Sequence, residues 1–135
     1  FAITMPAQPL AWFEGSNLYH EAFAASSVVK RYREIMNDLH SGIILPVGNE
    51  PDGRSFTGFQ SIKDEGGYLL LFREDTAEEE DLIKTWLPAD CTFNFELLLG
   101  NGKSFTGSTN CTSDLSVSLP GPYTYALYRY DAVLQ

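Results

Sequence analysis

The pattern of hydrophobic and polar positions is helical in the first third of the chain. From Ser26 to His40, apolar side chains recur three or four positions apart, with charged and polar side chains between them. This spacing places the apolar residues on one side of a helix and predicts a single amphipathic helix over residues 26–40. Ser26 or Ser27 can cap its start, and Gly42 can end it.

After this helix the period changes to that of β-strands. Glu50-Pro51-Asp52-Gly53 and Asp64-Glu65-Gly66-Gly67 are typical of turns. Turn signals every 8–12 residues over residues 43–135 favour an antiparallel sandwich or barrel of about seven or eight strands. Strands are expected at 43–45, 56–62, 68–72, 82–87, 92–99, 103–110, 115–119 and 123–134. In the fifth of these, alternation places four side chains on one face: Phe93, Phe95, Leu97 and Leu99.

The N-terminal segment has another character. Phe1-Ala2-Ile3-Thr4-Met5 is apolar and predicts a short strand before Pro6 and Pro9. It carries neither an initiator methionine nor the charged region of a signal peptide. We therefore expect the chain to be a piece of a longer protein.

Composition excludes several classes of partner. The 135 residues are enough for one domain, and 44% apolar residues can form a packed core. The charge of −9, from 9 basic and 18 acidic residues, argues against nucleic acid and against an anionic membrane surface. No run approaches the roughly 20 apolar residues of a membrane span.

The two cysteines leave two alternatives open. A three-residue turn at Gly100-Asn101-Gly102 would place Cys91 opposite Cys111, close enough for a disulfide, whereas a two-residue turn would place Cys91 opposite Thr112 and leave two thiols. Asn110-Cys111-Thr112 also matches the short pattern for N-glycosylation.

Candidate catalytic and metal-binding residues are few. The acidic run from Glu74 to Asp81 is expected to be a solvated loop, because like charges so close together disfavour burial. It lacks the spacing of a calcium loop. His40 suits a helix C-terminus, and with His20 as its sole companion it does not predict a zinc site. We predict no catalytic residue, no metal and no cofactor in this chain.

Aromatic side chains are the candidate binding residues. Sugar-binding surfaces use exposed tryptophan and tyrosine as flat platforms, although aromatic residues also fill β-sandwich cores. Trp86, Tyr123 and Tyr125 are the residues to examine. Burial of these rings would remove the platform, and a shared groove with polar side chains would support it.

Several segments together resemble one family of enzymes. The opening segment 1–12 resembles the last strand, and residues 26–40 the last helix, of the catalytic barrel in α-galactosidase-like (melibiase) glycoside hydrolases. Ile44 to Gly53, Phe56 to Ser61 and Gly67 to Glu74 resemble the start of the β domain that follows this barrel. The resemblance covers most of the chain through structural motifs.

The resemblance implies a division of the chain into two parts. Residues 1–42 would be a remnant of the (β/α)8 barrel, and residues 43–135 a C-terminal Greek-key β-sandwich. The two catalytic aspartates of the family would precede Phe1, so none is assigned here and the chain alone is expected to be inactive. An upstream barrel in the same polypeptide would be the partner, and the family's degradative role favours a periplasmic or extracellular location.

Three functions follow as hypotheses. The first is a non-catalytic domain that supports the barrel in carbohydrate metabolism; the alternative is a carbohydrate-binding module, and the third is an interaction domain without affinity for sugar. Loss of the barrel would leave Trp12, Phe13 and part of the helix without a partner surface. We therefore expect the isolated chain to form dimers or larger oligomers.

Overall fold

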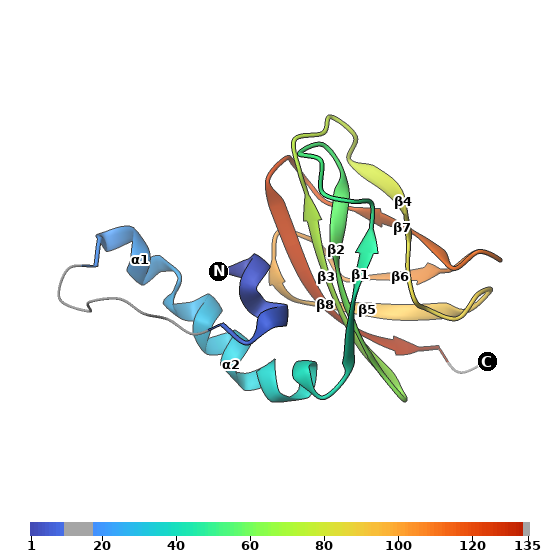
Figure 1. Ribbon diagram of the computed structural model, residues 1–135, viewed down its shortest axis with the longest axis horizontal. Coiled ribbons are helices and arrows are strands. Elements are labelled where there is room, and N and C mark those ends of the chain that lie inside the picture. The colour runs from blue at the N-terminus through green and yellow to red at the C-terminus, as the bar shows by residue number, and fades with distance from the viewer. Residues whose placement is uncertain (10–17, 134–135) are drawn as a thin grey trace.

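The protein has a mainly β fold, as the sequence predicts. The computed structural model describes residues 1–9 and 18–133. In this part of the chain, eight antiparallel strands form two sheets that follow short N-terminal helices (Figure 1). The elements are η1 (Ala2–Ala7), α1 (His20–Ala24), α2 (Ser26–His40), β1 (Ile43–Gly48), β2 (Phe56–Lys63), β3 (Gly66–Arg73), β4 (Glu80–Lys84), β5 (Thr92–Gly100), β6 (Phe105–Ser108), β7 (Asp114–Ser118) and β8 (Thr124–Ala132).

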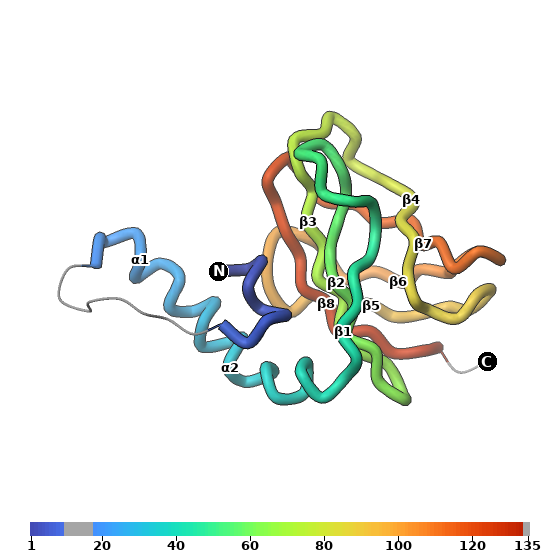
Figure 2. Tube along the Cα trace, in the orientation of Figure 1, coloured from blue at the N-terminus to red at the C-terminus, as the bar shows by residue number. Residues whose placement is uncertain are grey.

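The two sheets form a sandwich with the non-consecutive neighbours of a Greek-key arrangement. The large sheet has the order β1-β2-β3-β8-β5-β6, and the small sheet pairs β4 with β7. The chain leaves the large sheet after β3 to form β4, and again after β6 to form β7. Its last strand returns between β3 and β5, as the trace in Figure 2 shows.

The amphipathic helix has the predicted range but not the predicted caps. A short helix, α1, leads directly into α2 through Ala25, so neither Ser26 nor Ser27 caps a free end. At the other end, Ser41 closes the helix in a right-handed conformation, and its hydroxyl donates to the carbonyl of Asp38 over 2.7 Å. Gly42 is therefore not the helix-ending residue.

The predicted N-terminal strand is wrong. Residues 2–7 form the 3-10 helix η1, in which the backbone N–H and the hydroxyl of Thr4 both donate to the carbonyl of Phe1. Met5 is fully buried, and its carbonyl accepts a hydrogen bond from Tyr32 of α2 over 3.0 Å. A strand needs a neighbouring strand to pair with its backbone N–H and C=O groups. The segment η1 instead lies against α2, where the Tyr32 side chain bonds to its backbone.

The main core lies between the two sheets. It takes inward-facing residues from β2, β3, β5 and β8 of the large sheet and from β4 and β7 of the small one. Leu115, Val117 and Leu119 are buried while Ser116 and Ser118 are exposed, which confirms the predicted alternation. This burial is the main stabilising contribution to the sandwich.

The strand β5 changes face near its end. Phe93, Phe95 and Leu97 point into the core between the sheets, but Leu99 belongs to a second apolar cluster on the outer face of the large sheet. The prediction that all four share one face is wrong, because a β-bulge at Leu98 shifts the register with β8. An inserted residue reverses the faces of the positions that follow it.

Candidate functional site

Trp86 is held on the surface by the strand that precedes it. Thr85 and Leu87 are buried, so the alternation along the chain turns the intervening Trp86 outward, and the side chain is 55% exposed. The Thr85 hydroxyl donates to the carbonyl of Ser113 over 2.7 Å, which fixes this segment to the chain just before β7. The position of Trp86 is therefore set by the core beneath it.

Both N–H groups of Trp86 are engaged by the large sheet. Its indole N–H donates to the carbonyl of Pro46 in β1 over 2.8 Å, and its backbone N–H donates to Gln60 Oε1 in β2 over 2.9 Å. Gln60 is only 1% exposed, and its Nε2 donates to the hydroxyl of Tyr130 over 2.9 Å. Burial raises the pKa of Tyr130. The hydroxyl of Tyr130 in turn donates a hydrogen bond to the carbonyl of Ser61 over 3.3 Å.

A hollow of about 850 Å³ lies beside Trp86, and we call it the Trp86 groove. Its apolar and aromatic lining includes Leu87, Phe93 and Tyr130. Its charged lining consists of one ammonium and four carboxylates: Lys63, Asp64, Glu65, Asp90 and Asp131. An aromatic surface beside several carboxylates can contact apolar faces and hydroxyl groups of one ligand.

The two candidate tyrosines lie in a different hollow. Tyr123 and Tyr125 line a space of about 710 Å³ on the outer face of the large sheet, together with Phe59 and Phe72. The rings of Phe72 and Tyr125 lie 6.2 Å apart at 31°. Tyr123 is 79% exposed with φ of 58°, and a hydrogen bond with Asp75 raises its pKa. The sequence-predicted residues therefore occupy two surfaces.

The outer face of the large sheet is only partly covered. Helices η1 and α2 bury one part of it, where Met5, Tyr32 and Leu39 pack on Tyr68, Leu70 and Leu127. Beyond η1 the same face opens into the hollow of Tyr125, whose wall includes Phe1 and Ile3. Figure 1 shows α1 and the first turns of α2 projecting away from the sheet, and Tyr19 and Phe23 are exposed there.

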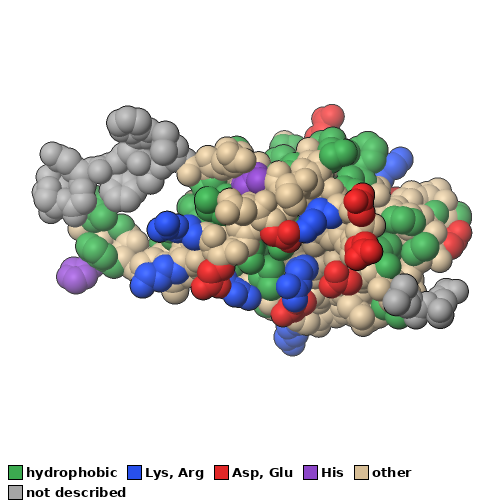
Figure 3. Space-filling view, turned by 90° about the horizontal axis from the view of Figure 1, so that it is seen from below, with side chains coloured by type: hydrophobic (Ala, Val, Ile, Leu, Met, Phe, Trp, Pro, Cys, Tyr) green, Lys and Arg blue, Asp and Glu red, His purple; other side chains and the backbone are tan. Residues whose placement is uncertain are grey.

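A charged cluster connects α2 to the sheet. Asp38 accepts hydrogen bonds from Lys63 and from the hydroxyl of Tyr68, and these contacts lower the pKa of its carboxyl group. Burial, and then the hydrogen bond to Asp38, raise the pKa of Tyr68. Figure 3, which views the molecule from below, shows acidic and basic side chains interspersed over this side. Nearby, Arg129 pairs with Glu96 at 2.5 Å.

The histidines and the acidic run form no cluster with the geometry of a metal site. His20 begins α1 and lies against Phe23, whereas His40 ends α2 with its Nε2 3.0 Å from the hydroxyl of Tyr32. Residues 77–80 of the acidic run are exposed, but the run is not a loop throughout as predicted, because Glu80 and Asp81 begin β4 and pair with β7. Within residues 1–9 and 18–133, no group of three acidic, histidine or cysteine side chains is placed to hold a metal ion.

Both predicted registers for the cysteines are wrong. Cys91 lies opposite Thr109, whose N–H donates to the Cys91 carbonyl over 2.9 Å, and Cys91 and Cys111 are free thiols. The reason is that Asn101 does not form the hairpin turn; its N–H donates instead to the carbonyl of Tyr125 in β8. The pairing of β5 with β6 therefore ends at Phe95 and Phe105, and the loop between these residues is longer than either predicted turn.

The Asn110 side chain organises a turn before β7. Its Oδ1 accepts hydrogen bonds from the backbone N–H groups of Thr112 and Asp114, each over 2.9 Å. Hydrogen bonds from Thr112 and Asn110 lower the pKa of Asp114. The residues of the glycosylation pattern thus have a local structural role.

Sequence reasoning missed Gln60 and the Asp38–Tyr68 contact. Gln60 is a polar residue inside a strand, and this is the one signal in the sequence that it has a buried partner. Its partners Trp86 and Tyr130 lie 26 and 70 positions away, so their identity depends on the sheet order. Trp12 and Phe13, expected to lack a partner surface, lie outside the described residues.

Comparisons with known proteins assign no family to this chain. None of the described helices is both long and apolar enough to cross a membrane. A scan of protein-family profiles and searches of curated proteins and of solved structures find no match.

Proposed function

We propose that this chain is the non-catalytic C-terminal part of an α-galactosidase-like glycoside hydrolase, and that its β-sandwich supports the catalytic barrel. Residues 43–135 would form the supporting domain, and residues 1–42 would belong to the barrel. The proposal starts from the resemblance of residues 26–40 to the last helix of such a barrel, and of residues 44–53, 56–61 and 67–74 to the start of its β domain. The resemblance of residues 1–12 to a barrel strand gives it no support, because residues 2–7 form η1.

The observation that carries the proposal is the partly covered outer face of the large sheet. Phe72 and Tyr125 lie at the open part of this face, beside the exposed Phe1 and Ile3 of the N-terminal segment. Together with Tyr19 and Phe23 on the projecting helix, they form what we call the docking face. Large exposed apolar surface marks contacts with another protein surface or domain.

The hydrolase chemistry would belong to the upstream barrel. Glycoside hydrolysis uses two carboxylates that flank the scissile bond, and the resemblance implies that both catalytic aspartates precede Phe1. The supporting domain would contribute stability to the barrel through the docking face. We expect this contribution to be hydrophobic, because the face carries few charges.

The test compares this chain with the polypeptide extended upstream of Phe1. Reading the upstream coding sequence should reveal a (β/α)8 barrel with two catalytic aspartates. The extended polypeptide should hydrolyse 4-nitrophenyl α-galactoside, whereas the 135-residue chain alone should not. Hydrolysis by the chain alone, or an upstream region that encodes another fold, would overturn the proposal.

A second comparison tests the supporting role. The substitution Phe72→Glu places a carboxylate at the docking face, and Leu82→Glu is a matched control at an exposed position on β4. In the extended polypeptide, Phe72→Glu should lower the melting temperature of the barrel and Leu82→Glu should not. Equal effects of the two substitutions would contradict a docking role for this face.

A further inference from the structure

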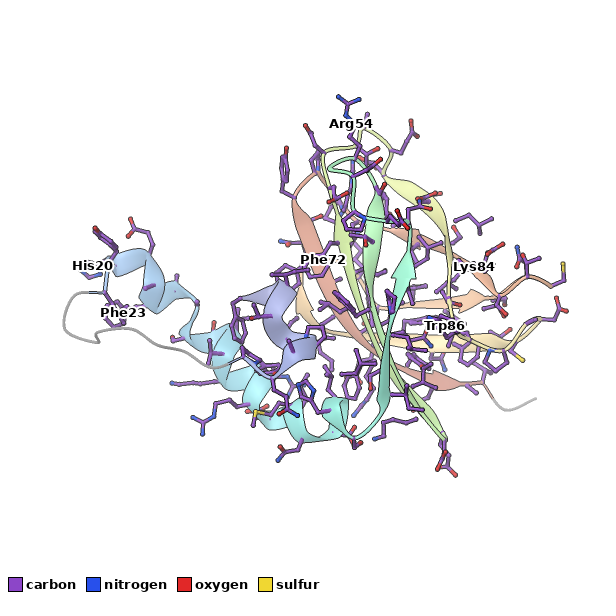
Figure 4. The ribbon with its side chains drawn as sticks, viewed as in Figure 1. His20, Phe23, Arg54, Phe72, Lys84 and Trp86 are labelled. Carbon is purple, nitrogen blue, oxygen red and sulfur yellow. The ribbon has the colours of Figure 1, made fainter. Side chains whose placement is uncertain are left out.

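We propose that the Trp86 groove binds a neutral pyranoside sugar, with the indole ring stacked on the apolar face of the sugar. This site lies outside the docking face and goes beyond the supporting role proposed above. In Figure 4, Phe72 lies on the side of the sheet that faces η1, whereas Trp86 lies toward the other side of the sandwich. A sugar can therefore reach Trp86 whether or not a barrel covers the docking face.

The side chain of Trp86 is exposed and yet fixed in orientation. An exposed tryptophan ordinarily loses side-chain freedom when it binds a ligand, and this loss weakens binding. Here the indole N–H is bonded to Pro46 and the backbone N–H to the buried Gln60, so the ring orientation is set before binding. The hydrogen bond from Gln60 to Tyr130 fixes Gln60 in turn.

The lining of the groove combines an aromatic ring with hydrogen-bond acceptors, as a sugar requires. The C–H face of a pyranose is apolar and flat and contacts an aromatic ring, while its hydroxyl groups donate hydrogen bonds at the edge. Asp90 and Asp131 provide exposed acceptors beside Trp86 in the same hollow. Its volume of about 850 Å³ falls in the usual range for small-ligand sites.

The charge of the groove favours a neutral ligand. Four carboxylates and one ammonium line the groove, so its potential is negative. Sugars with a carboxylate or sulfate group would be repelled, and neutral pyranosides such as galactosides would not. The groove therefore selects against uronic acids even though their rings have the same apolar face.

Fluorescence of a single tryptophan provides the test. The protein has two tryptophans, so a Trp12→Phe background leaves Trp86 as the one reporter. Galactose, melibiose and galacturonate are titrated into this protein while Trp86 emission and the indole ¹H–¹⁵N signal are followed. We expect galactose or melibiose to bind with a dissociation constant of about 1 mM or tighter, and galacturonate at least about tenfold more weakly.

Two variants and a control show whether the binding involves the groove. Trp86→Ala, followed by calorimetry, should weaken binding about tenfold or more. Asp90→Asn should weaken it about threefold; Asp90 has φ of 54°, a conformation that asparagine accepts, so this variant keeps the fold. Tyr123→Ala, an exposed aromatic residue in the other hollow, should leave binding unchanged.

Three results would contradict the proposal that the Trp86 groove binds a sugar. One is the absence of any Trp86 response to the neutral sugars up to about 50 mM, far above the expected dissociation constant. Another is sugar binding that survives both Trp86→Ala and Asp90→Asn, because the ligand would then lie elsewhere. A third is tighter binding of galacturonate than of galactose. None of these results would affect the docking face, which is tested with different substitutions.

Discussion

The hydroxyl of Tyr68 donates a hydrogen bond to Asp38 Oδ2 over 2.6 Å, and this contact joins the last turn of α2 to β3. Lys63 of β2 bonds to the other oxygen of the same carboxylate. The pKa of Asp38 is therefore lower in the folded protein than in the unfolded chain. The stability of the contact between α2 and the sandwich therefore depends on pH.

Stability should depend on pH through Asp38. Because its folded-state pKa is depressed, the contact stabilises the protein above the unfolded value of about 4 and is lost as the pH falls through the lower folded value. Tyr68→Phe should lower the free energy of unfolding by about 1 kcal/mol between pH 5 and 8. The difference from the unsubstituted protein should shrink toward pH 3.

Urea unfolding at several pH values measures this difference. Tyr130→Phe is the control, because the Tyr130 hydroxyl bonds to Gln60 and to a backbone carbonyl and to no carboxylate. Its cost should be the same at pH 3 and pH 7. A Tyr68→Phe cost that also stays constant over this range would exclude Asp38 as the titrating partner.

Arg73 should contribute more to stability than any exposed arginine. Its guanidinium is 3% exposed and donates to the carbonyls of Leu119, Thr76 and Ala77, which ties the end of β3 to the acidic loop and to the end of β7. Arg73→Met removes these bonds and should cost about 2–3 kcal/mol in the free energy of unfolding.

Arg129→Met provides the matched comparison for Arg73. Arg129 is exposed and pairs with Glu96, so its replacement should cost about 0.5 kcal/mol or less. Chemical denaturation of both variants gives the two values. Similar costs for Arg73 and Arg129 would mean that the carbonyl contacts of Arg73 contribute little.

The cysteines should be titratable as two thiols. Cys91 lies opposite Thr109 and Cys111 lies in the turn that follows, so they do not form a pair. Unfolded protein prepared without reductant should react with two equivalents of a thiol reagent. The melting temperature should be the same with and without reductant, and a reductant-dependent melting temperature would contradict the observed register.

The strands could be predicted because burial on one face dictates alternation of apolar and polar residues. Leu115 to Leu119 shows this plainly, and each of the eight strands overlaps an expected segment, although β4 begins and ends earlier than expected. Pairing partners could not be predicted in the same way. The hairpin register depends on the hydrogen bond from Asn101 to Tyr125 in β8, and the outward orientation of Leu99 depends on a bulge against β8.

The candidate site was only partly accessible from the sequence. Trp86 could be named because sugar-binding surfaces use exposed tryptophan and tyrosine as platforms, but its rigidity depends on Pro46 and Gln60 from other strands. The separation of Trp86 from Tyr123 and Tyr125 likewise follows from sheet order. Such contacts are long-range, and local pattern carries no information about them.

Self-association should arise from the docking face. Ile3 and Phe23 are exposed apolar residues on the N-terminal helices, and the isolated chain is expected to form dimers or larger oligomers through this surface. Ile3→Ser with Phe23→Ser should shift the molar mass from light scattering toward the monomer. Leu82→Ser should not change it, and a monomeric unsubstituted protein at high concentration would count against the docking face.

Hydroxyl-radical footprinting of the upstream-extended polypeptide tests the account most directly. Side-chain oxidation is compared between this polypeptide and the 135-residue chain, at Phe23, Tyr125 and Trp86. The account predicts that Phe23 and Tyr125 become protected in the extended polypeptide, because the barrel covers the docking face, while Trp86 is oxidised equally in both. Equal oxidation of Phe23 and Tyr125 in the two proteins would contradict the supporting role.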